Sequence, residues 1–371
     1  LPEALDVIAS LGLSGIELNT GGFLPAIHVP TMDDILVSDT ARDDFLGIFE
    51  GTGVDIAGLN CNGNPLHPDA AIGGKHADDV RRSIRLANRL GQTRVVTMSG
   101  LPGGEPGATR VNWVVNAWNS AALDVLDYQW EIAADFWRET DRLAADLGVK
   151  VALELHPQNI VFNTRDVRKL VELTGATHVG VELDASHLFW QQMDPVAVVR
   201  ELGELIFHAA AKDVRVNPEN ARLHGVLDNG FRRLRADEDR VNLGGDEWAN
   251  EWPKDSAWDF VALGRGHDVA IAVVVVDGSC GSAGILEVQA IERRANLECC
   301  CARLRLCSSM SVRDIEDGGM LAQHIIGRRP VLVLTVVTRT GHQQCIRADS
   351  VPTIRMELEI LRILVGMHRK E

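Results

Sequence analysis

The chain has 371 residues and a formal net charge of −15, and 46% of its residues are hydrophobic. This charge argues against nucleic acid or an anionic membrane as the main partner. The sequence has no apolar run of about 18 residues, so it predicts no transmembrane helix. It also begins without a basic segment followed by an apolar one, so we expect no signal peptide and a cytoplasmic protein.

Helices and strands alternate along the first 211 residues. Apolar residues at helical spacing predict the helices, and short runs rich in Val, Ile and Leu predict the strands. Such an alternation implies a parallel sheet with right-handed crossovers. Helices are predicted over 2–11, 39–49 (with Asp39 as its N-cap), 76–90, 128–147, 165–173 and 195–202, and strands over 14–19, 54–60, 94–98, 149–155, 179–183 and 205–211.

Two sheet architectures fit this alternation. Six units that each start with a helix and end with a strand suggest a (β/α) barrel whose first strand is absent. The alternative is an open, doubly wound sheet, which usually has a glycine-rich phosphate loop after its first strand. The sequence contains neither GxGxxG nor GxxxxGK, so the barrel is favoured.

The composition changes near residue 269. Cys61 is the only cysteine before this point and six follow it, while Phe, Trp and Tyr are all absent after Phe260. Residues 269–371 carry 13 Lys and Arg against 11 Asp and Glu, although the whole chain is acidic. The cysteine spacing fits no zinc or disulfide pattern. We therefore predict a barrel over 1–268 and, over 269–371, a segment of unrelated composition that is frameshifted or disordered.

Three consecutive strands end in residues that can bind metals. In a barrel the carboxyl ends of the strands meet at one mouth, so these side chains can converge. Two carboxylates and an imidazole suit one divalent ion, Mn²⁺, Mg²⁺, Co²⁺ or Zn²⁺. The alternative is a structural network of the acids with Lys212 or Arg215. The predicted metal ligands are Glu154, Asp184 and His208.

Further polar residues near these strand ends are candidates for contacts with a substrate. Histidine, lysine, arginine and asparagine side chains suit the hydroxyl and carbonyl groups of a sugar. Alternatively, Asp184 caps the following helix and His187 packs at the start of that helix. The alternative for the asparagines is that they form turns. The predicted substrate-binding residues are His187, Lys212, Arg215, His156 and Asn62.

Several motifs together resemble the xylose-isomerase-like barrel superfamily of sugar phosphate isomerases and epimerases. The resemblance covers about residues 1–268 and implies a TIM barrel with one divalent ion at its mouth. It assigns the ligands supplied by successive strands to Glu154, Asp184 and His208, a substrate contact to His187, and a basic residue to Arg215. The matching segments are GLSGIELNTGG, CNGNPLHPD, VALELHP, VELDASHLFWQQMDPV, IFHAAAKDVRV and GRGHD.

The chain also departs from this family pattern. The first strand is absent, and the last strand, whose Glu is the fourth ligand, is expected shortly after Asp268 but not found. The expected fold is thus an α/β, (β/α)8 TIM barrel that is incomplete. The expected function is metal-dependent isomerisation or epimerisation of a sugar or sugar phosphate, with Glu154 as the base. An inosose-type dehydratase and a truncated barrel without activity are the alternatives, and a homo-oligomer is left open.

Overall fold

A computed structural model describes residues 1–240, 250–262 and 265–266. It also describes the backbone of six short strands that pair in three two-stranded sheets, β8 with β9, β11 with β12 and β13 with β14. These strands are β8 (Asn242–Gly244), β9 (Glu247–Trp248), β11 (Val269–Val274), β12 (Glu287–Glu292), β13 (Thr335–Val337) and β14 (Gln343–Cys345). The rest of the predicted segment 269–371 lies outside the described residues, as does the expected last-strand Glu.

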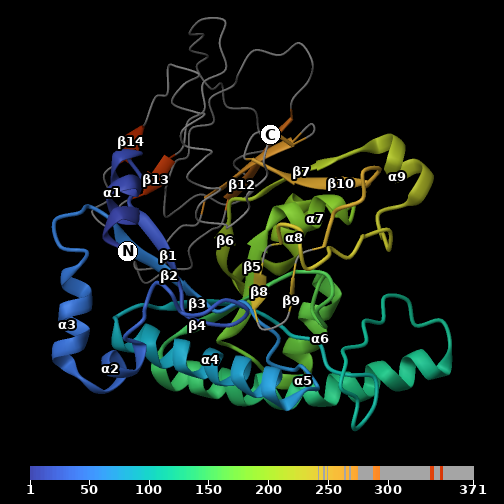
Figure 1. Cartoon of the computed structure of the whole chain (residues 1–371), viewed down its shortest axis with the longest axis horizontal. Helices are drawn as coiled ribbons and strands as arrows, with labels where there is room; N and C mark the ends of the chain where they lie inside the picture. The colour runs from blue at the N-terminus through green and yellow to red at the C-terminus, as the bar shows by residue number, and fades with distance from the viewer. Residues whose placement is uncertain are drawn as a thin grey trace, which may run out of the picture.

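Six parallel strands form the central sheet, in the same order as in the sequence (Figure 1). All six were predicted, and their bounds shift by one or two residues at most. The sheet curls into a half-barrel, so the α/β barrel prediction is confirmed. The strands are β1 (Gly15–Asn19), β2 (Asp55–Asn60), β3 (Arg94–Met98), β4 (Lys150–Glu154), β5 (Val179–Asp184) and β6 (Ile206–Ala210).

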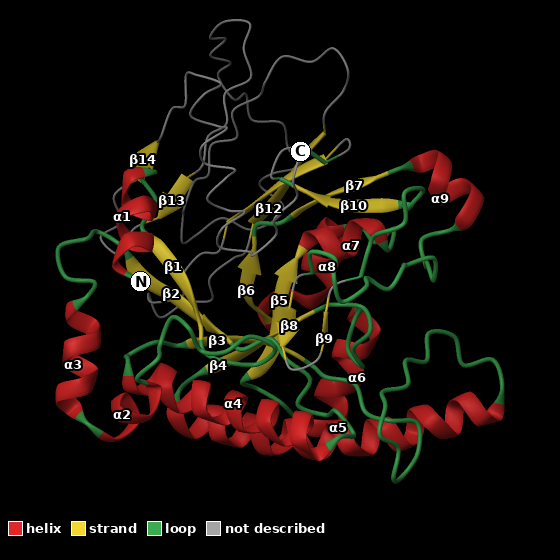
Figure 2. Cartoon of the chain, viewed as in Figure 1, coloured by secondary structure: helices red, strands yellow, loops and turns green. Residues whose placement is uncertain are grey.

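Helices cover the outer face of this sheet (Figure 2). The apolar stripe of each helix packs on the buried aliphatic residues of the strands, as in other α/β folds. Val95, Val151 and Val181 lie in this core and are fully buried. The helices are α1 (Pro2–Ser10), α2 (Met32–Val37), α3 (Asp39–Gly47), α4 (Ala70–Arg89), α5 (Ser120–Leu147), α6 (Thr164–Thr174), α7 (Ala185–Trp190) and α8 (Pro195–Leu202), with a 3₁₀ turn over Gly203–Leu205.

Side-chain caps decide where several helices begin. Asp69 accepts a hydrogen bond from the Ala71 amide, so α4 begins six residues before the predicted start. Asn119 caps α5 in the same way, eight residues before its predicted start. For α3 the predicted cap, Asp39, was wrong: the Ser38 side chain accepts from the Ala41 amide instead.

A small antiparallel unit follows β6. Strand β7 (Asp213–Val216) pairs with β10 (Trp258–Val261), and α9 (Pro218–His224) lies between them in the sequence. Strand β7 packs against α7, above the carboxyl ends of the barrel strands (Figure 1). Stacked indole rings 4.4 Å apart join Trp190 of α7 to Trp258 of β10. The chain therefore folds back over the end of the barrel where the polar residues gather. Among the described helices, none is long and apolar enough to cross a membrane.

Candidate active site

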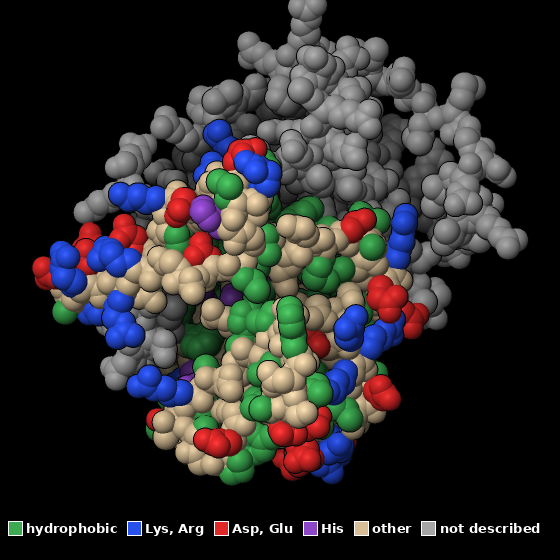
Figure 3. Space-filling model, turned by 90° about the vertical axis from the view of Figure 1, so that its right-hand side faces the viewer, with side chains coloured by type: hydrophobic (Ala, Val, Ile, Leu, Met, Phe, Trp, Pro, Cys, Tyr) green, Lys and Arg blue, Asp and Glu red, His purple; other side chains and the backbone are tan. Residues whose placement is uncertain are grey.

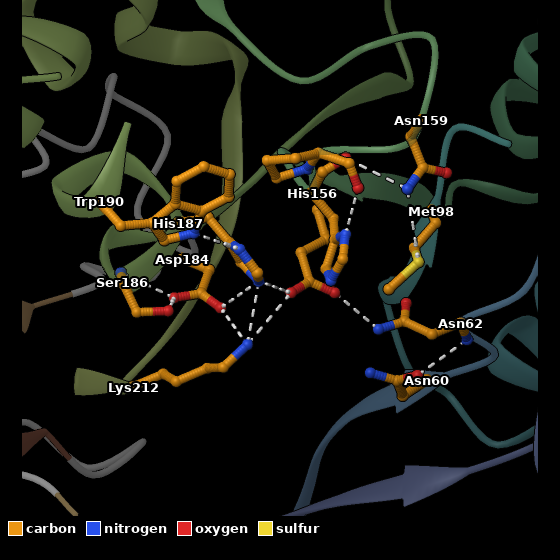
Figure 4. A network of polar contacts seen from close by, with 12 residues as sticks. Asn60, Asn62, Met98, His156, Asn159, Asp184, Ser186, His187, Trp190 and Lys212 are labelled. Atoms are coloured by element: carbon orange, nitrogen blue, oxygen red, sulfur yellow. Dashed lines mark hydrogen bonds and ion pairs between the residues drawn. The ribbon is translucent and has the colours of Figure 1, made fainter. Parts of the chain in front are cut away.

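Glu154 and Asp184 are the last residues of neighbouring strands, β4 and β5. Both side chains are buried, with 6% and 2% of their surfaces exposed. The ammonium nitrogen of Lys212 lies between them, 3.1 Å from Oδ2 of Asp184 and 3.7 Å from Oε1 of Glu154 (Figure 4). The strand ends thus bring together two of the predicted metal ligands and one predicted substrate contact.

Asp184 both caps a helix and faces this group. Its Oδ1 accepts hydrogen bonds from the amide and the hydroxyl of Ser186, at 2.9 and 2.7 Å. These bonds fix the start of α7 and orient the carboxylate. The other oxygen, Oδ2, is left to face Lys212 and His187. The helix cap considered for this residue is therefore observed, and it leaves Oδ2 available, so that the metal-ligand role stays a prediction.

His187 lies in the same group and is 1% exposed. Its Nε2 lies 3.1 Å from Oε1 of Glu154 and 3.0 Å from Nζ of Lys212. The indole nitrogen of Trp190 donates to Nδ1 at 3.3 Å. Since an indole N–H can only donate, Nδ1 is unprotonated and a neutral ring carries its proton on Nε2. His187 is then a hydrogen-bond donor to Glu154 and not an acceptor.

Asn62 holds the second oxygen of Glu154. Its side-chain Nδ2 donates a hydrogen bond to Oε2 of Glu154 at 2.8 Å. Its backbone N–H donates to Oδ1 of Asn60 at 2.9 Å. Asn62 Oδ1 is buried and has no hydrogen-bond partner among the described residues. A buried acceptor of this kind needs a donor. A hydroxyl of a bound molecule would supply it.

His156 lies beside His187, with the ring centroids 4.2 Å apart and the ring planes tilted by 55°. Its Nδ1 lies within hydrogen-bond distance of the Pro157 carbonyl oxygen, so that nitrogen carries the proton. Burial, with the neighbouring His187, lowers the pKa of His156 to about 4. The ring is therefore neutral near pH 7 and provides a flat, uncharged wall on one side of the group.

The electrostatics keep Glu154 ionised. Burial would raise its pKa, but the hydrogen bond from His187 and the charge of Lys212 outweigh burial and lower the pKa well below its usual range. Burial would lower the pKa of Lys212, but the carboxylates of Asp184 and Glu154 outweigh it and raise that pKa. Phe260 covers the ammonium, whose nitrogen lies 4.2 Å from the ring centroid. Glu154 is thus an anion that holds a neutral imidazole and faces an ammonium.

His208 is not part of this group, contrary to the prediction. Its Nε2 lies 3.1 Å from Oε2 of Glu17, and the ligand atoms of these two residues and Glu182 lie within 4.8 Å of one another. The reason is the strand register, which places Glu182 between Glu154 and His208. His187 takes the place predicted for His208, so that Glu154, Asp184 and His187 form a separate set within the same limit.

Arg215 also lies apart. It is half-exposed on β7, and its guanidinium pairs with Asp259 of β10 at 3.2 Å. Sequence reasoning missed three further residues: Glu17 and Glu182 inside the curled sheet, and Phe260 of β10, which covers Lys212. Of these, Glu182 carried a signal, since it is a second acid, besides Asp184, in a strand that is otherwise apolar and buried over its whole length.

A divalent cation fits between Glu154 and Asp184 if the Lys212 ammonium moves away. The Lys212 ammonium shows that a single positive charge can lie between the two carboxylates, and oxygen donors suit Mg²⁺ and Mn²⁺. Lys212 would have to withdraw, which its partly exposed side chain allows. His187 does not fit as a ligand while Trp190 donates to its Nδ1, because Nε2 then keeps its proton.

The described surface shows a recess on the face seen in Figure 3, with histidine visible inside it. The fold and site together define an α/β barrel with acids, histidines and a lysine at the carboxyl ends of its strands. A family model described as the xylose isomerase-like TIM barrel matches residues 5–270, and the chain belongs to this family.

Two relatives show how far the likeness extends. YfiH, an uncharacterised protein of Bacillus subtilis, is 34% identical over 271 residues, which are 72% of this chain and 80% of that protein. The inosose dehydratase of Clostridium beijerinckii is 29% identical over 89 residues, which are 24% of this chain and 30% of that enzyme. The match to the dehydratase is therefore local, and that to YfiH spans most of both chains.

Solved structures give a weaker match. The probable 3-DHS dehydratase AsbF of Bacillus anthracis aligns with a TM-score of 0.42 and 18% identity, covering 62% of this chain and 77% of that chain. A xylose isomerase-like TIM barrel protein of Mycobacterium smegmatis in complex with magnesium also aligns with a TM-score of 0.42 and 18% identity, covering 58% and 67%.

Proposed function

We propose that this protein is a metal-dependent isomerase or epimerase of a sugar or sugar phosphate, which transfers a proton next to a carbonyl. The observation that carries the proposal is the ionised, buried Glu154 held at 3.1 Å by His187 and at 2.8 Å by Asn62. A general base must be deprotonated and fixed in direction before the substrate arrives. Glu154 meets both requirements, and Lys212 and Asp184 lie beside it.

Each residue of the group has a role in this reaction. Glu154 removes the proton from the carbon next to the carbonyl. The ammonium of Lys212 donates to the carbonyl oxygen, where negative charge develops as the proton leaves, while the one N–H of His187 keeps Glu154 in place. Asn62 Oδ1 accepts a hydrogen bond from a substrate hydroxyl, and the neutral ring of His156 packs beside it. A bound divalent cation, held by Glu154 and Asp184, would polarise the carbonyl and its neighbouring hydroxyl.

Dehydration is a second candidate, favoured by the local match to inosose dehydratase. It shares the first step, because removal of a proton next to a ketone also precedes loss of a β-hydroxyl group. The leaving hydroxyl then needs a proton, and the Lys212 ammonium is the acid at hand. The two candidates differ in their product: an epimerised or isomerised sugar, or an unsaturated ketone and water.

Proton exchange with solvent tests the proposal. The full chain with Mn²⁺ is incubated in ²H₂O with D-fructose, or with the cyclic ketone myo-inosose, and deuterium incorporation is followed by NMR. We expect exchange in wild type and a loss of about 10²-fold or more in Glu154→Gln, the range for a lost general base. Glu172→Gln, an exposed glutamate of α6, is the matched control.

Four outcomes decide between the candidates. Exchange without loss of water supports the isomerase or epimerase, whereas an absorbing unsaturated ketone supports the dehydratase. Exchange that survives in Glu154→Gln contradicts the assigned base. No exchange in folded wild type supports the third prediction, a barrel without activity. The division at residue 268, the cytoplasmic location and the substrate contact of Arg215 stay predictions.

A further inference from the structure

A second polar group lies inside the curled sheet, deeper than the group at its mouth. It consists of Glu17 of β1, Glu182 of β5 and His208 of β6. Nε2 of His208 lies 3.1 Å from Oε2 of Glu17, and one ligand atom from each of the three residues lies within 4.8 Å of the others. Glu182 and His208 are direct neighbours in register, two residues before the level of Asp184. The deeper group shares no residue with the site proposed above, although Glu182 is also the register neighbour of Glu154.

Glu182 has no partner of its own in this group. Its side chain is 3% exposed, and no hydrogen bond or ion pair joins it to any residue that the structure describes. Carboxylates of Glu17, Glu154 and Asp184 surround it and add like charge. Lys212, the nearby cation, is bound to Asp184 at 3.1 Å. A buried carboxylate in these surroundings has to be neutralised, and a bound cation would do this.

The other two residues are already oriented toward a shared point. Asn60 donates to Oε1 of Glu17 at 2.9 Å, which leaves Oε2 to face His208. Gly58 of β2 leaves room beside them: an added Cβ there would lie 3.7 Å from Cε1 of His208 and 3.9 Å from Oε2 of Glu17. These are ordinary van der Waals distances, so a single methyl group would fit at Gly58 beside the donor atoms.

We propose that Glu17, Glu182 and His208 bind a divalent cation at a second site. Two carboxylates and one imidazole are a donor set that suits Mn²⁺ or Zn²⁺. The cation would neutralise Glu182 and join β1 to β5 and β6 across the interior of the sheet. This site does not depend on the proposed reaction, because none of its residues takes part in it.

The number of Mn²⁺ ions bound per chain tests the second site. Equilibrium dialysis of the full chain, with free Mn²⁺ read by electron paramagnetic resonance, is expected to give two ions in wild type. Glu182→Gln removes the deeper ion and Asp184→Asn the ion at the mouth, so each variant binds one. Glu172→Gln is the control for a lost carboxylate elsewhere and keeps two.

The ion counts distinguish failure of the deeper metal site from failure of the metal site at the mouth. If wild type binds one ion and Glu182→Gln binds none, the deeper site stands and the metal at the mouth falls. If Glu182→Gln binds as many ions as wild type with the same affinity, the deeper site is overturned. Wild type that binds no ion overturns both metal assignments, while the proton-exchange test of Glu154 still decides the reaction.

Folding of the variants does not confuse this test. Glu182→Gln replaces a buried carboxyl group without a partner by a neutral group of the same shape, so the metal-free protein is expected to melt at the same temperature as wild type or higher. What it loses is the rise in melting temperature on adding Mn²⁺. His208→Asn is expected to weaken Co²⁺ binding tenfold or more and change the visible Co²⁺ spectrum, while His224→Asn, an exposed histidine, leaves both unchanged. An unaltered spectrum in His208→Asn would remove histidine from the ligand set.

Discussion

Oε2 of Glu17 lies 3.1 Å from Nε2 of His208, although β1 and β6 are the two edges of a six-stranded sheet. In a flat sheet five strand spacings separate such edges, about 24 Å. The contact therefore reports how far the sheet curls. Arg94 of β3 gives the same result, since its Nε donates across the interior to the Phe207 carbonyl of β6 at 3.0 Å. This curl makes an enclosed interior out of six strands.

Gly180 of β5 is expected to be essential for the pairing of β5 with β6. An added Cβ would overlap the Leu205 carbonyl oxygen and the ring of Phe207. Gly180→Ala should lower the free energy of unfolding by about 2 kcal/mol or more, as overpacking does. Urea denaturation measures this change. Gly74→Ala is the control: it lies in α4 with open space around it and should be neutral or slightly stabilising. Equal effects of the two variants would contradict the close packing at 180.

Removal of the Lys212 ammonium should strengthen cation binding at the mouth of the barrel. Lys212 holds the place between Asp184 and Glu154 that a divalent ion would take. In Lys212→Met the ion no longer competes with this charge, so the affinity of the protein for the divalent ion should rise about tenfold or more. Mn²⁺ titration measures it, with the exposed Lys254→Met as control. The same variant should lose proton exchange, since it lacks a donor to the carbonyl. Weaker Mn²⁺ binding would show that Lys212 does not compete with the ion.

Trp190 is expected to fix the tautomer of His187. Its indole N–H donates to Nδ1, which keeps the proton on Nε2. Trp190→Phe retains a ring that can stack on Trp258 but removes the donor, so the two tautomers should mix. Nitrogen-15 NMR of the His187 ring measures the mixture, and proton exchange should fall about tenfold.

The control for this prediction is Trp113→Phe. The Trp113 indole nitrogen is buried and has no partner among the described residues, so its removal should not affect the His187 ring. Unchanged nitrogen-15 shifts of His187 in Trp190→Phe would show that the tautomer is set in another way.

His156 is expected to make the fold sensitive to acid. Its folded pKa of about 4 lies below the usual value of 6.5, so below pH 6.5 the unfolded chain binds the proton more readily than the folded one. Stability should therefore fall as the pH drops from 6.5 toward 4, by at most about 3 kcal/mol. Asp166, whose pKa burial raises to about 6, acts in the opposite direction.

A comparison of variants separates these two effects. Urea unfolding of wild type and His156→Gln between pH 4 and 7 should give a shallower decline in the variant, because the group that takes up the proton on unfolding is gone. Asp166 is present in both proteins and cancels in the difference. Parallel curves for the two proteins would show that His156 does not titrate between pH 4 and 6.5 on unfolding.

The sequence by itself determined the order of the six barrel strands and of six helices, and half of the site. Apolar runs and helix caps are local signals, and a strand that ends in Glu154 or Asp184 places its acid at the same edge of any parallel sheet. The α/β barrel and the meeting of these two acids could therefore be predicted from residues alone. The burial of β5 over its whole length was visible in the same way.

Only the tertiary structure decided which imidazole joins them. His208 is a strand residue whose partners depend on register and on the curl that brings β1 back to β6, and neither can be read from the local sequence. His187 joins the acids because Asp184 caps α7 and sets the direction of its first turn. The separation of the polar residues into a group at the mouth, with Lys212, and a deeper group around Glu182 thus depends on contacts between residues far apart in the chain.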